Sequence, residues 1–473
     1  MPPPGDDGSV DWAGVQCTVA GLGVAGFAVA EALLERGASV CVVDSSDGDS
    51  QRERAEVLGI LGARVVLGAQ DEYPGGDLLV VSPGLRPNAP IITDALHRGI
   101  TVWGELELAW RLRGQSAPPW LLVTGTNGKT TATLMLASML TAAGLRTTAA
   151  GNIGVSLVEV VTRESLDVIA VEVGAPQLPF VTSMSPWAAA CLNIAEDHVD
   201  HFGSMAAYRA AKARVYHLAQ LAAVYNVDDP QTEQMVEDAD VIAGCRAIGF
   251  TLGVPKPGML GVVDDILVDR AFVADRRTSA QELATVGDVR PHAPHNVANA
   301  LAAAALARSY GVEPAAVREG LRAFKPAPHR ISTVATIGGV AYVDDSKATN
   351  AHAALTSLQA YTQVVWIAGG LAKGQRFEDL IKAVRDRLRG VVLLGRDREV
   401  IAEALRELAP QVPVIEVSSN EPGAMYDVVR QAAALASPGT TVLLAPGCAS
   451  WDMYRDYGHR GDTFVQAVRS LPT

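Results

Sequence analysis

The sequence lacks paired cysteines, a long apolar run and an apolar leader, and each absence excludes a class of protein. Its five cysteines are an odd number without any CxxC spacing, so we expect buried free thiols in a reducing compartment rather than disulfides. The longest apolar stretches, such as residues 298–307, read as buried helix, because a membrane span needs ~18 residues. The first eleven residues have neither the basic start nor the apolar core of a signal peptide, so we expect a cytoplasmic protein without a membrane partner.

Basic residues are too few for a nucleic-acid partner. Lys plus Arg total 39 against 52 Asp plus Glu, and the formal charge of −13 repels phosphate backbones. Small anionic ligands remain compatible with this charge, because a local glycine loop or lysine binds phosphate regardless of the net charge. With 473 residues, 49% of them hydrophobic, the chain is long enough for about three globular domains of ~150 residues each.

Short apolar strands alternate with helical stretches, which predicts parallel α/β sheets. Residues 15–44 predict one strand, glycine turn, helix and strand unit, built around the loop Gly21-Leu-Gly23-Val-Ala-Gly26. An acid, Asp44, follows this loop by about twenty residues, as in dinucleotide-binding folds. Taken alone, the loop is weak evidence, and it also fits a nicotinamide- or flavin-dependent oxidoreductase.

Two proline-marked joints, at residues 115–119 and 325–328, divide the chain. We expect an N-terminal Rossmann-like domain, a central P-loop mononucleotide-binding domain and a C-terminal Rossmann-like domain, all of the α/β class. Their predicted bounds are 1–116, 117–327 and 328–473. Within the central domain, residues 251–292 are rich in Gly, Pro and Val and predict a small β insertion.

The second glycine loop is the strongest single motif. Thr124-Gly125-Thr-Asn-Gly128-Lys129-Thr130-Thr131 follows a predicted strand and opens a predicted helix, where backbone N–H groups and the helix dipole favour a phosphate. Lys129 is expected to reach the β/γ-phosphates, and the Thr130 hydroxyl to hold Mg²⁺. The loop has the compact G-x-x-G-K-T form, and a chance match at a helix start is the alternative.

Acidic and imidazole side chains follow two further predicted strands of the central domain. Glu172 lies near the end of the strand at 168–173, and Glu196-Asp197-His198 follows the strand at 188–193. Because ligands approach α/β sheets at the carboxyl ends of strands, we expect these groups to converge with the phosphate loop as metal or acid/base groups. A solvated loop is the alternative for each of them.

Jointly, these motifs resemble the Mur ligase family of peptidoglycan synthesis over about residues 15–470. The motifs that occur in the family's order are the phosphate loop, Gly151-Asn152-Ile-Gly154, Glu196-Asp197-His198, Tyr208-Arg-Ala-Ala-Lys212, His295-Asn296, Pro328-His329-Arg330 and Asp345-Ser346-Lys347-Ala-Thr-Asn350. The first glycine loop, Ser82-Pro83-Gly84 and Pro446-Gly-Cys448-Ala-Ser450 are most similar to the branch that adds D-glutamate to UDP-N-acetylmuramoyl-L-alanine. The resemblance implies an ATP-dependent carboxylate–amine ligase that works through an acyl phosphate.

The resemblance also implies roles for individual residues. Those implied to bind the UDP-sugar are Gly23, Val24, Ala25, Asp44, Ser45, Ser82, Gly84 and Asn152. Those implied to bind ATP are Gly125, Thr126, Asn127, Gly128, Lys129, Thr130, Thr131, Asn296, Asn299, Arg330, Asp345 and Lys347. Those implied around D-glutamate are Thr349, Lys373, Ser450, Trp451 and Tyr457. Two Mg²⁺ ions are implied on Thr130, Glu172, His198 and Lys212, with Lys212 carrying a carbamate formed with CO₂; the implied catalytic set is Lys129, Glu172, His198 and Lys212.

The implied partners are small molecules only, namely UDP-N-acetylmuramoyl-L-alanine and D-glutamate, and we expect a monomer. The nearest alternatives are sister ligases that add L-alanine, diaminopimelate or lysine, and folylpolyglutamate synthase, which share the central loop. A non-catalytic regulator that binds nucleotide and muropeptide is a further alternative. The implied metal ligands argue against it, because a binding module does not need them.

Overall fold

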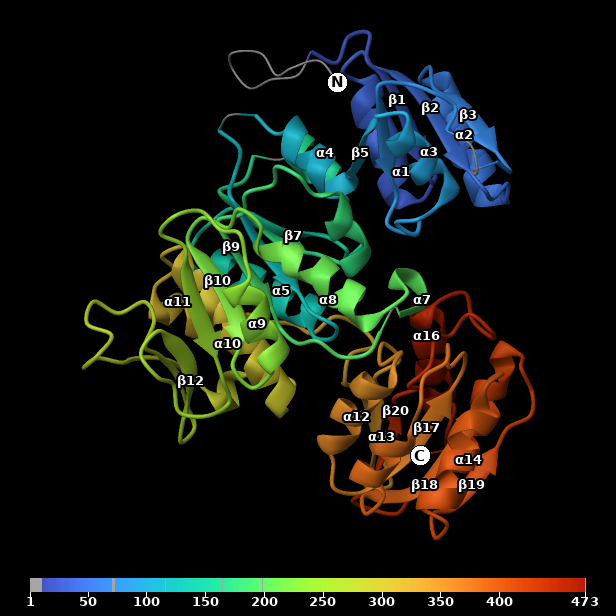
Figure 1. The fold of residues 1–473 in the computed structure, drawn as a ribbon. Coiled ribbons are helices and arrows are strands. Elements are labelled where there is room, and N and C mark those ends of the chain that lie inside the picture. The colour runs from blue at the N-terminus through green and yellow to red at the C-terminus, as the bar shows by residue number, and fades with distance from the viewer. Residues whose placement is uncertain (1–10, 70–72, 115, 164, 198, 473) are drawn as a thin grey trace. The chain divides into compact units, whose positions relative to one another are not determined.

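The structure is a computed structural model that describes residues 11–69, 73–114, 116–163, 165–197 and 199–472 (Figure 1). The chain forms two compact units, which are Met1–Val289 with Asn296–Phe324 and Arg290–His295 with Lys325–Thr473. Two sheets lie in the first unit and one in the second. The expected architecture of three α/β domains in series is confirmed, whereas the three domain bounds remain a prediction.

The first sheet has five parallel strands in the order β3-β2-β1-β4-β5. These are β1 (Gln16–Ala20), β2 (Ser39–Asp44), β3 (Arg64–Leu67), β4 (Leu78–Val81) and β5 (Thr101–Gly104). The accompanying helices are α1 (Val24–Leu34), α2 (Asp49–Ile60), α3 (Pro90–His97) and α4 (Glu105–Leu112). The strand order reverses between β1 and β4, and open α/β sheets bind ligands at such a point. The predicted strand, glycine turn, helix and strand unit is confirmed as β1, α1 and β2.

The central sheet has nine strands in the order β14-β13-β12-β11-β10-β9-β6-β8-β7. These are β6 (Trp120–Thr124), β7 (Thr147–Gly151), β8 (Val168–Glu172), β9 (Ala188–Cys191), β10 (Ala222–Asn226), β11 (Arg246–Phe250), β12 (Met259–Val263), β13 (Ile266–Asp269) and β14 (Gln281–Thr285). Its helices are α5 (Lys129–Ala142), α6 (Leu157–Arg163), α7 (Val199–Phe202), α8 (Met205–Ala213), α9 (Pro230–Glu237), α10 (Pro294–Ser309) and α11 (Pro314–Ala323). Strands β6, β8 and β9 are neighbours, so the segments that follow them meet at one edge.

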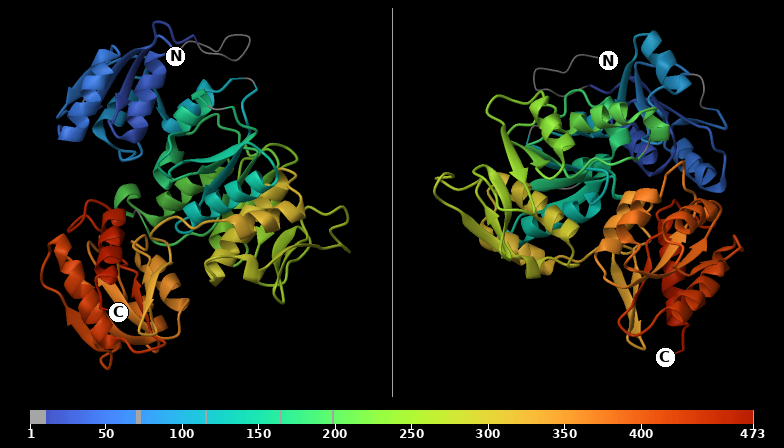
Figure 2. Two further views of the ribbon diagram at one scale, coloured as in Figure 1. Left: turned by 180° about the vertical axis from the view of Figure 1, so that it is seen from behind. Right: turned by 60° about the horizontal axis from the view of Figure 1, so that its bottom comes forward.

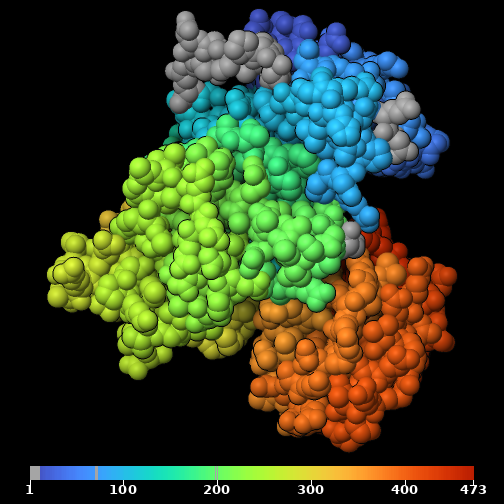
Figure 3. Space-filling model, in the orientation of Figure 1, coloured from blue at the N-terminus to red at the C-terminus, as the bar shows by residue number. Residues whose placement is uncertain are grey.

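The predicted β insertion extends this central sheet. Strand β12 pairs in parallel with β11, and β12, β13 and β14 then form an antiparallel meander at the edge of the sheet. The loop between β13 and β14 projects from the surface of the central domain (Figure 1, Figure 3). The insertion therefore lies at the end of the sheet away from β6 and β8.

Helix α5, which opens at the phosphate loop, packs closely against α11. Ser138 Oγ donates to the carbonyl oxygen of Gly320 at 2.7 Å. A Cβ atom on Gly320 would lie 2.4 Å from Met139 Cα, so this approach of two helix backbones requires glycine. The predicted buried helix is confirmed as α10, whose residues 300–307 are all buried. The helix that carries the phosphate loop is therefore held by packing well beyond the loop.

The C-terminal sheet has six strands in the order β15-β16-β20-β17-β18-β19. These are β15 (Ser332–Ile337), β16 (Val340–Asp344), β17 (Val364–Gly369), β18 (Leu388–Leu394), β19 (Val414–Glu416) and β20 (Thr441–Leu444). Its helices are α12 (Ala351–Gln359), α13 (Glu378–Val384), α14 (Arg398–Leu408), α15 (Met425–Leu435) and α16 (Tyr457–Arg469). Only the β15 and β16 pair is antiparallel.

Helices cover both faces of the C-terminal sheet (Figure 2). Along β17, Val364, Trp366 and Ala368 enter one apolar cluster, whereas Val365 and Ile367 enter another on the opposite face. Such two-sided burial explains why this strand is apolar at consecutive positions instead of alternating with polar residues.

The structure also bears on the thiols and on membrane insertion. All five cysteines are free, as expected, and Cys17, Cys191 and Cys448 are buried. Burial raises the pKa of Cys191 to about 12, so this thiol stays protonated at neutral pH. Over the described ranges, no helix combines the length and the apolar character that crossing a membrane requires.

Two buried glutamates of α4 join the first sheet to the central domain. Glu105 Oε1 accepts hydrogen bonds from Ser156 Oγ at 2.7 Å and from Leu157 N at 3.0 Å, at the start of α6. The fully buried Glu107 accepts bonds from Thr182 N and Ser183 N, both at 2.9 Å, and from the Ser183 hydroxyl. These carboxylates therefore satisfy backbone donors of the neighbouring domain.

Glu107 is ionised in this environment. Burial alone raises the pKa of Glu107, but hydrogen bonds from Ser183, Thr182 and Arg111 outweigh it, and the net pKa lies below the usual value. A carboxyl group with a depressed pKa stabilises the fold above its unfolded pKa, and this stabilisation is lost as the pH falls through the folded pKa.

We predict that Glu107→Ala lowers the free energy of unfolding of the first unit by about 3 kcal/mol, because buried N–H donors and Arg111 lose their acceptor. Urea denaturation at pH 7.5 measures the change. Glu159→Ala is the control, since the Glu159 side chain is half exposed on α6 and should cost less than about 0.5 kcal/mol. Equal unfolding midpoints for the two variants would contradict this role of Glu107.

Candidate active site

The phosphate loop joins β6 to α5 and depends on two glycines. Gly125 has a φ of 151° and Gly128 a φ of 82°, conformations that other residues rarely adopt. A Cβ atom on Gly128 would lie 2.4 Å from Asn299 Oδ1, so α10 contacts the loop directly. Asn299 Nδ2 in turn donates to Asn296 Oδ1 at 3.3 Å. Of the two ATP residues predicted on α10, Asn299 therefore contacts the loop, and Asn296 contacts Asn299.

Lys129 lies over the loop that precedes it. Its Nζ donates to the carbonyl oxygens of Gly125 and Thr126, both at 2.9 Å. The loop is also fixed from β9, because Asn127 N donates to Asn193 Oδ1 at 2.9 Å and Asn193 Nδ2 donates back to Asn127 O at 3.2 Å. This contact of Asn193 with the loop was not predicted, because it depends on the neighbouring positions of β6 and β9 in the sheet.

Glu172 brings together residues from three segments. It is 2% exposed at the end of β8, and its Oε2 accepts a hydrogen bond from Thr130 Oγ1 at 2.5 Å. Its Oε1 accepts from Asn152 Nδ2 at 2.9 Å, just after β7. The predicted convergence of Glu172 with the loop is therefore present. Asn152, predicted from the resemblance to reach the UDP-sugar, here contacts the carboxylate of Glu172.

Lys212 is buried below the loop. It is 1% exposed on α8, and its Nζ donates to the Gly125 carbonyl at 2.7 Å and lies 5.0 Å from the centre of the Tyr208 ring. Burial, and next the positive charge of Lys129, lower the pKa of Lys212 to about 7. Near neutral pH, a large fraction of this side chain is therefore the uncharged amine, which is a nucleophile.

Tyr208 connects α8 to the same loop. Its hydroxyl lies 3.0 Å from Thr126 Oγ1, which also accepts a hydrogen bond from Ala195 N at 2.9 Å. His198, a predicted metal ligand in the segment after Ala195, lies outside the described residues. The predicted convergence of His198 with Glu172 therefore stays a prediction.

The described donor groups beside the phosphate loop fit Mg²⁺. In the part of the chain that the structure describes, no three His, Cys, Asp or Glu side chains gather as a metal site. Mg²⁺ is usually held by one or two carboxylates, substrate phosphates and water. The carboxylate of Glu172 and the hydroxyl of Thr130, in contact beside a phosphate loop, satisfy that requirement.

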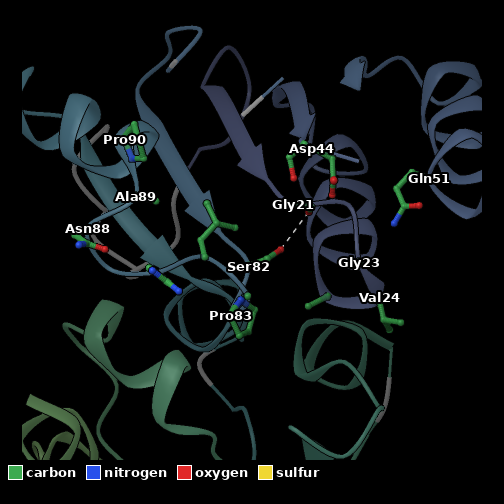
Figure 4. Close-up of a pocket in the computed structure, with 15 residues that line it drawn as sticks. Gly21, Gly23, Val24, Asp44, Gln51, Ser82, Pro83, Asn88, Ala89 and Pro90 are labelled. Carbon is green, nitrogen blue, oxygen red and sulfur yellow. Dashed lines mark hydrogen bonds between the residues drawn. The ribbon is translucent and has the colours of Figure 1, made fainter. Parts of the chain in front are cut away.

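The first sheet has an open pocket of about 760 Å³ at the edge where its strand order reverses (Figure 4). Seven of the eight residues predicted for the UDP-sugar line it, namely Gly23, Val24, Ala25, Asp44, Ser45, Ser82 and Gly84. A Cβ atom on Gly26 would lie 1.8 Å from Gly21 O, so the third glycine of the loop permits close packing of α1. Gln51, Arg86 and Asn88 also line the pocket, although the sequence analysis did not select them.

In the C-terminal unit, Asp345 lies at the end of β16 among predicted nucleotide contacts. It is 7% exposed and accepts a hydrogen bond from Ser357 Oγ. Burial raises the pKa of Asp345 to about 7, while that hydrogen bond and the charge of Arg330 act in the opposite direction. Arg460, 1% exposed on α16, holds the next turn by donating to Ser346 Oγ and Ser346 O. Arg460 was not among the predicted site residues.

The residues predicted around D-glutamate form two cation–aromatic pairs. Lys373 Nζ lies 4.1 Å from the centre of the exposed Trp451 ring, and Lys347 Nζ lies 3.9 Å from that of Tyr457. Ser450 is buried next to Trp451. Thr349 N donates to Lys347 O at 2.8 Å. The predicted ATP residue Lys347 thus contacts a predicted D-glutamate residue, and neither binding role is tested by this arrangement.

The comparisons with known proteins agree along the chain. The family profile "Mur ligase middle domain" matches residues 123–307, "Mur ligase, glutamate ligase domain" matches 329–448, and "Mur ligase MurD-like, N-terminal domain" matches 15–104. The chain belongs to the Mur ligase family. The first match includes the phosphate loop, Glu172 and Lys212.

Two relatives of this Mur ligase illustrate the similarity. The UDP-N-acetylmuramoylalanine--D-glutamate ligase of Streptomyces coelicolor is 56% identical over 98% of this chain and 99% of its own. The enzyme of the same name from Thermobifida fusca is 53% identical over 97% of this chain and 99% of its own. The alignments span nearly the full length of all the proteins compared.

Solved structures of other Mur ligases share the fold. The UDP-N-acetylmuramate-alanine ligase MurC of Thermotoga maritima has a TM-score of 0.59 at 21% identity, over 96% of this chain and 99% of its own. The MurF ligase of the same organism, in complex with ADP, has a TM-score of 0.56 at 15% identity, over 91% and 95%. At such identities the likeness concerns the fold alone.

We predict that Gly128→Ala weakens ATP binding at least roughly tenfold, because the added Cβ would collide with Asn299 and distort the loop. Isothermal titration calorimetry with ATP and Mg²⁺ measures the affinity. Gly144→Ala is a matched control at the other end of α5, since Gly144 has a φ of 79° but open space around it. Unchanged ATP affinity in Gly128→Ala would contradict the importance of this contact.

Proposed function

We propose that this Mur ligase adds D-glutamate to UDP-N-acetylmuramoyl-L-alanine, with ATP as phosphoryl donor, in peptidoglycan precursor synthesis. The observation that carries the proposal is 56% identity over 98% of the chain to a relative that is named for this reaction. The glycine loop with Lys129, Glu172 and Lys212 around it supports catalysis rather than binding alone.

The reaction must first activate a carboxylate, which is a poor acyl donor. The alanyl carboxylate attacks the γ-phosphorus of ATP, so that a C–O–P bond forms and ADP leaves. The amine of D-glutamate then attacks the acyl carbon, loses a proton, and the tetrahedral intermediate expels phosphate as the amide forms. Both the nucleophile and the phosphoryl group are anionic in the first step, so the site must supply positive charge.

Residues of the central domain supply much of that charge and the positioning. The N–H groups at the start of α5 can donate to a phosphate, and Lys129 supplies a cation beside the same loop. Thr130 and Glu172 would hold Mg²⁺, because they offer a hydroxyl and a buried carboxylate in contact. When bound, Mg²⁺ adds positive charge beside the phosphate oxygens. Asn152 orients Glu172 through its amide.

A second Mg²⁺ and a carbamate on Lys212 are a finer part of this proposal, with His198 as the other protein ligand. An ammonium cannot bind a metal ion, but a neutral amine can attack CO₂, forming an N–C bond and releasing a proton. The product is an anionic oxygen donor suited to a hard ion. The lowered pKa of Lys212, about 7, supports this step because the neutral amine is available near pH 7.

The outer domains bind the two co-substrates in this proposal. The pocket of the first sheet takes the UDP-sugar, and Lys373, Thr349, Ser450, Trp451 and Tyr457 take D-glutamate. Arg330, Asp345 and Lys347 contact the nucleotide from the C-terminal domain. In this proposal the domain bounds at residues 116 and 327 separate the regions that bind the UDP-sugar, ATP and D-glutamate.

We also propose a monomer acting in the cytoplasm, where its UDP-linked substrate and ATP are available. Light scattering should give a mass near 49.6 kDa, and cell fractionation should find the activity with the soluble fraction. A stable dimer or membrane-bound activity would overturn these two statements without affecting the chemistry.

The function is tested by phosphate release in the presence of ATP, Mg²⁺, UDP-N-acetylmuramoyl-L-alanine and D-glutamate. We expect release to require both co-substrates, and a panel with L-alanine, L-lysine and diaminopimelate to give little activity. Lys129→Ala should lower kcat by on the order of 10³-fold, because a charge beside the transferring phosphoryl group is lost. No release with D-glutamate, or preference for another amino acid, would refute the assignment.

We predict that Lys212→Ala loses most activity and that short carboxylates such as acetate or formate restore part of it by replacing the carbamate. Arg209→Ala, on the exposed side of α8, is the charge-matched control and should stay active. In the unchanged protein, depletion of CO₂ should lower activity, and bicarbonate should restore it more fully above pH 7 than at pH 6, since Lys212 is deprotonated above its pKa. Full activity of Lys212→Ala would exclude the carbamate.

A further inference from the structure

The pocket of the first sheet carries very little charge. Among its described lining residues there is one carboxylate, Asp44, and one cation, Arg86. The chain as a whole has a formal charge of −13, which repels an anionic ligand. Any strongly anionic group that enters this pocket must therefore find its positive charge locally.

Both carboxylate oxygens of Asp44 accept hydrogen bonds from the backbone around the pocket. Its Oδ2 accepts a hydrogen bond from Leu22 N at 2.5 Å, and its Oδ1 accepts one from Ser46 N at 2.7 Å. This carboxylate ties the glycine loop after β1 to the turn after β2. It also occupies the N–H of Leu22, and Val43 O occupies that of Gly21, so these loop donors are unavailable to a ligand.

The side chain of Arg86 differs from that of Asp44 in its contacts. Its side chain is exposed, and within the described ranges it has neither a hydrogen bond nor an ion pair. The other arginines of this domain near the pocket are engaged: Arg52 pairs with Asp47, Arg98 pairs with Asp94, and Arg54 donates to Leu22 O. Among the described residues that line this pocket, Arg86 thus supplies a guanidinium without a hydrogen-bond or ion-pair partner.

The place of Arg86 in the chain favours a phosphate ligand. It lies two residues after Gly84, in the segment that leaves β4 at the point where the strand order reverses. In this crevice α/β sheets place the phosphates of a nucleotide, next to the start of the helix that follows β1. A guanidinium can donate two parallel hydrogen bonds to phosphate oxygens, which an ammonium cannot do with the same geometry.

We propose that Arg86 binds the diphosphate of the UDP-linked substrate and supplies the positive charge that this pocket otherwise lacks. The inference rests on the proposed function, since that function places a UDP-sugar in the pocket. Arg86 thereby selects nucleoside diphosphates over nucleosides. The neutral uracil ring gains little from an unpaired cation, so the effect belongs to the phosphates.

The test measures the binding of UDP, UMP and uridine by calorimetry to the unchanged protein and to Arg86→Ala. We expect UDP affinity to fall roughly 10- to 100-fold in Arg86→Ala while uridine affinity stays within twofold. Arg86→Lys should keep the charge but lose the bidentate geometry and lie between the two. Raising the salt concentration should weaken UDP binding by the unchanged protein more than by Arg86→Ala.

Arg52→Ala is the matched control. It removes the same charge from the same domain, but Arg52 does not line the pocket. In turnover, Arg86→Ala should raise KM for the UDP-sugar and leave kcat and KM for ATP unchanged. UDP affinity within twofold of the unchanged protein, or an equal loss of uridine and UDP binding, would overturn the role of Arg86 alone. Absence of UDP binding by the unchanged protein would overturn both this inference and the UDP-sugar assignment.

Discussion

The amino groups of Lys129 and Lys212 both donate to the carbonyl oxygen of Gly125. The rest of the site depends on how the repulsion between these two groups is avoided. Two ammonium ions held this close in a buried place would repel one another strongly. Burial, and next the positive charge of Lys129, lower the pKa of Lys212 to about 7, so Lys212 gives up its proton more readily than a free lysine. Loss of that proton removes the repulsion between the two amino groups at the shared carbonyl.

The order of strands in the central sheet brings these groups together. Strands β6, β8 and β9 are adjacent, so the loop after β6, Glu172 at the end of β8 and Asn193 after β9 meet without long connections. Helix α10 closes the other side of the loop through Asn299, and α11 fixes α5 through Gly320. The residues that position the site are therefore distributed over the whole central domain, while the loop and Glu172 lie at neighbouring strand ends.

The sequence predicts those features that are local and leaves open those that depend on distant segments. The phosphate loop, the unit of β1, α1 and β2, and the buried helix α10 follow from short patterns, and the structure has them. The burial of Lys212 does not follow, because its helix has the composition of a surface helix and its partners include Gly125, which is far away in sequence. Asn193, Arg86 and Arg460 were missed for the same reason, since their partners or pockets are formed by segments far away in sequence.

The glutamates of α4 have a consequence for substrate length. Their buried hydrogen bonds connect the first sheet to α6 and to the turn at Thr182, so sliding these parts past one another would leave acceptors and donors unpaired. These bonds therefore limit changes in the distance between the pocket of the first sheet and the phosphate loop. If the pocket takes the UDP-sugar, as proposed, only a substrate long enough to reach from the pocket to the loop can present its carboxylate for activation.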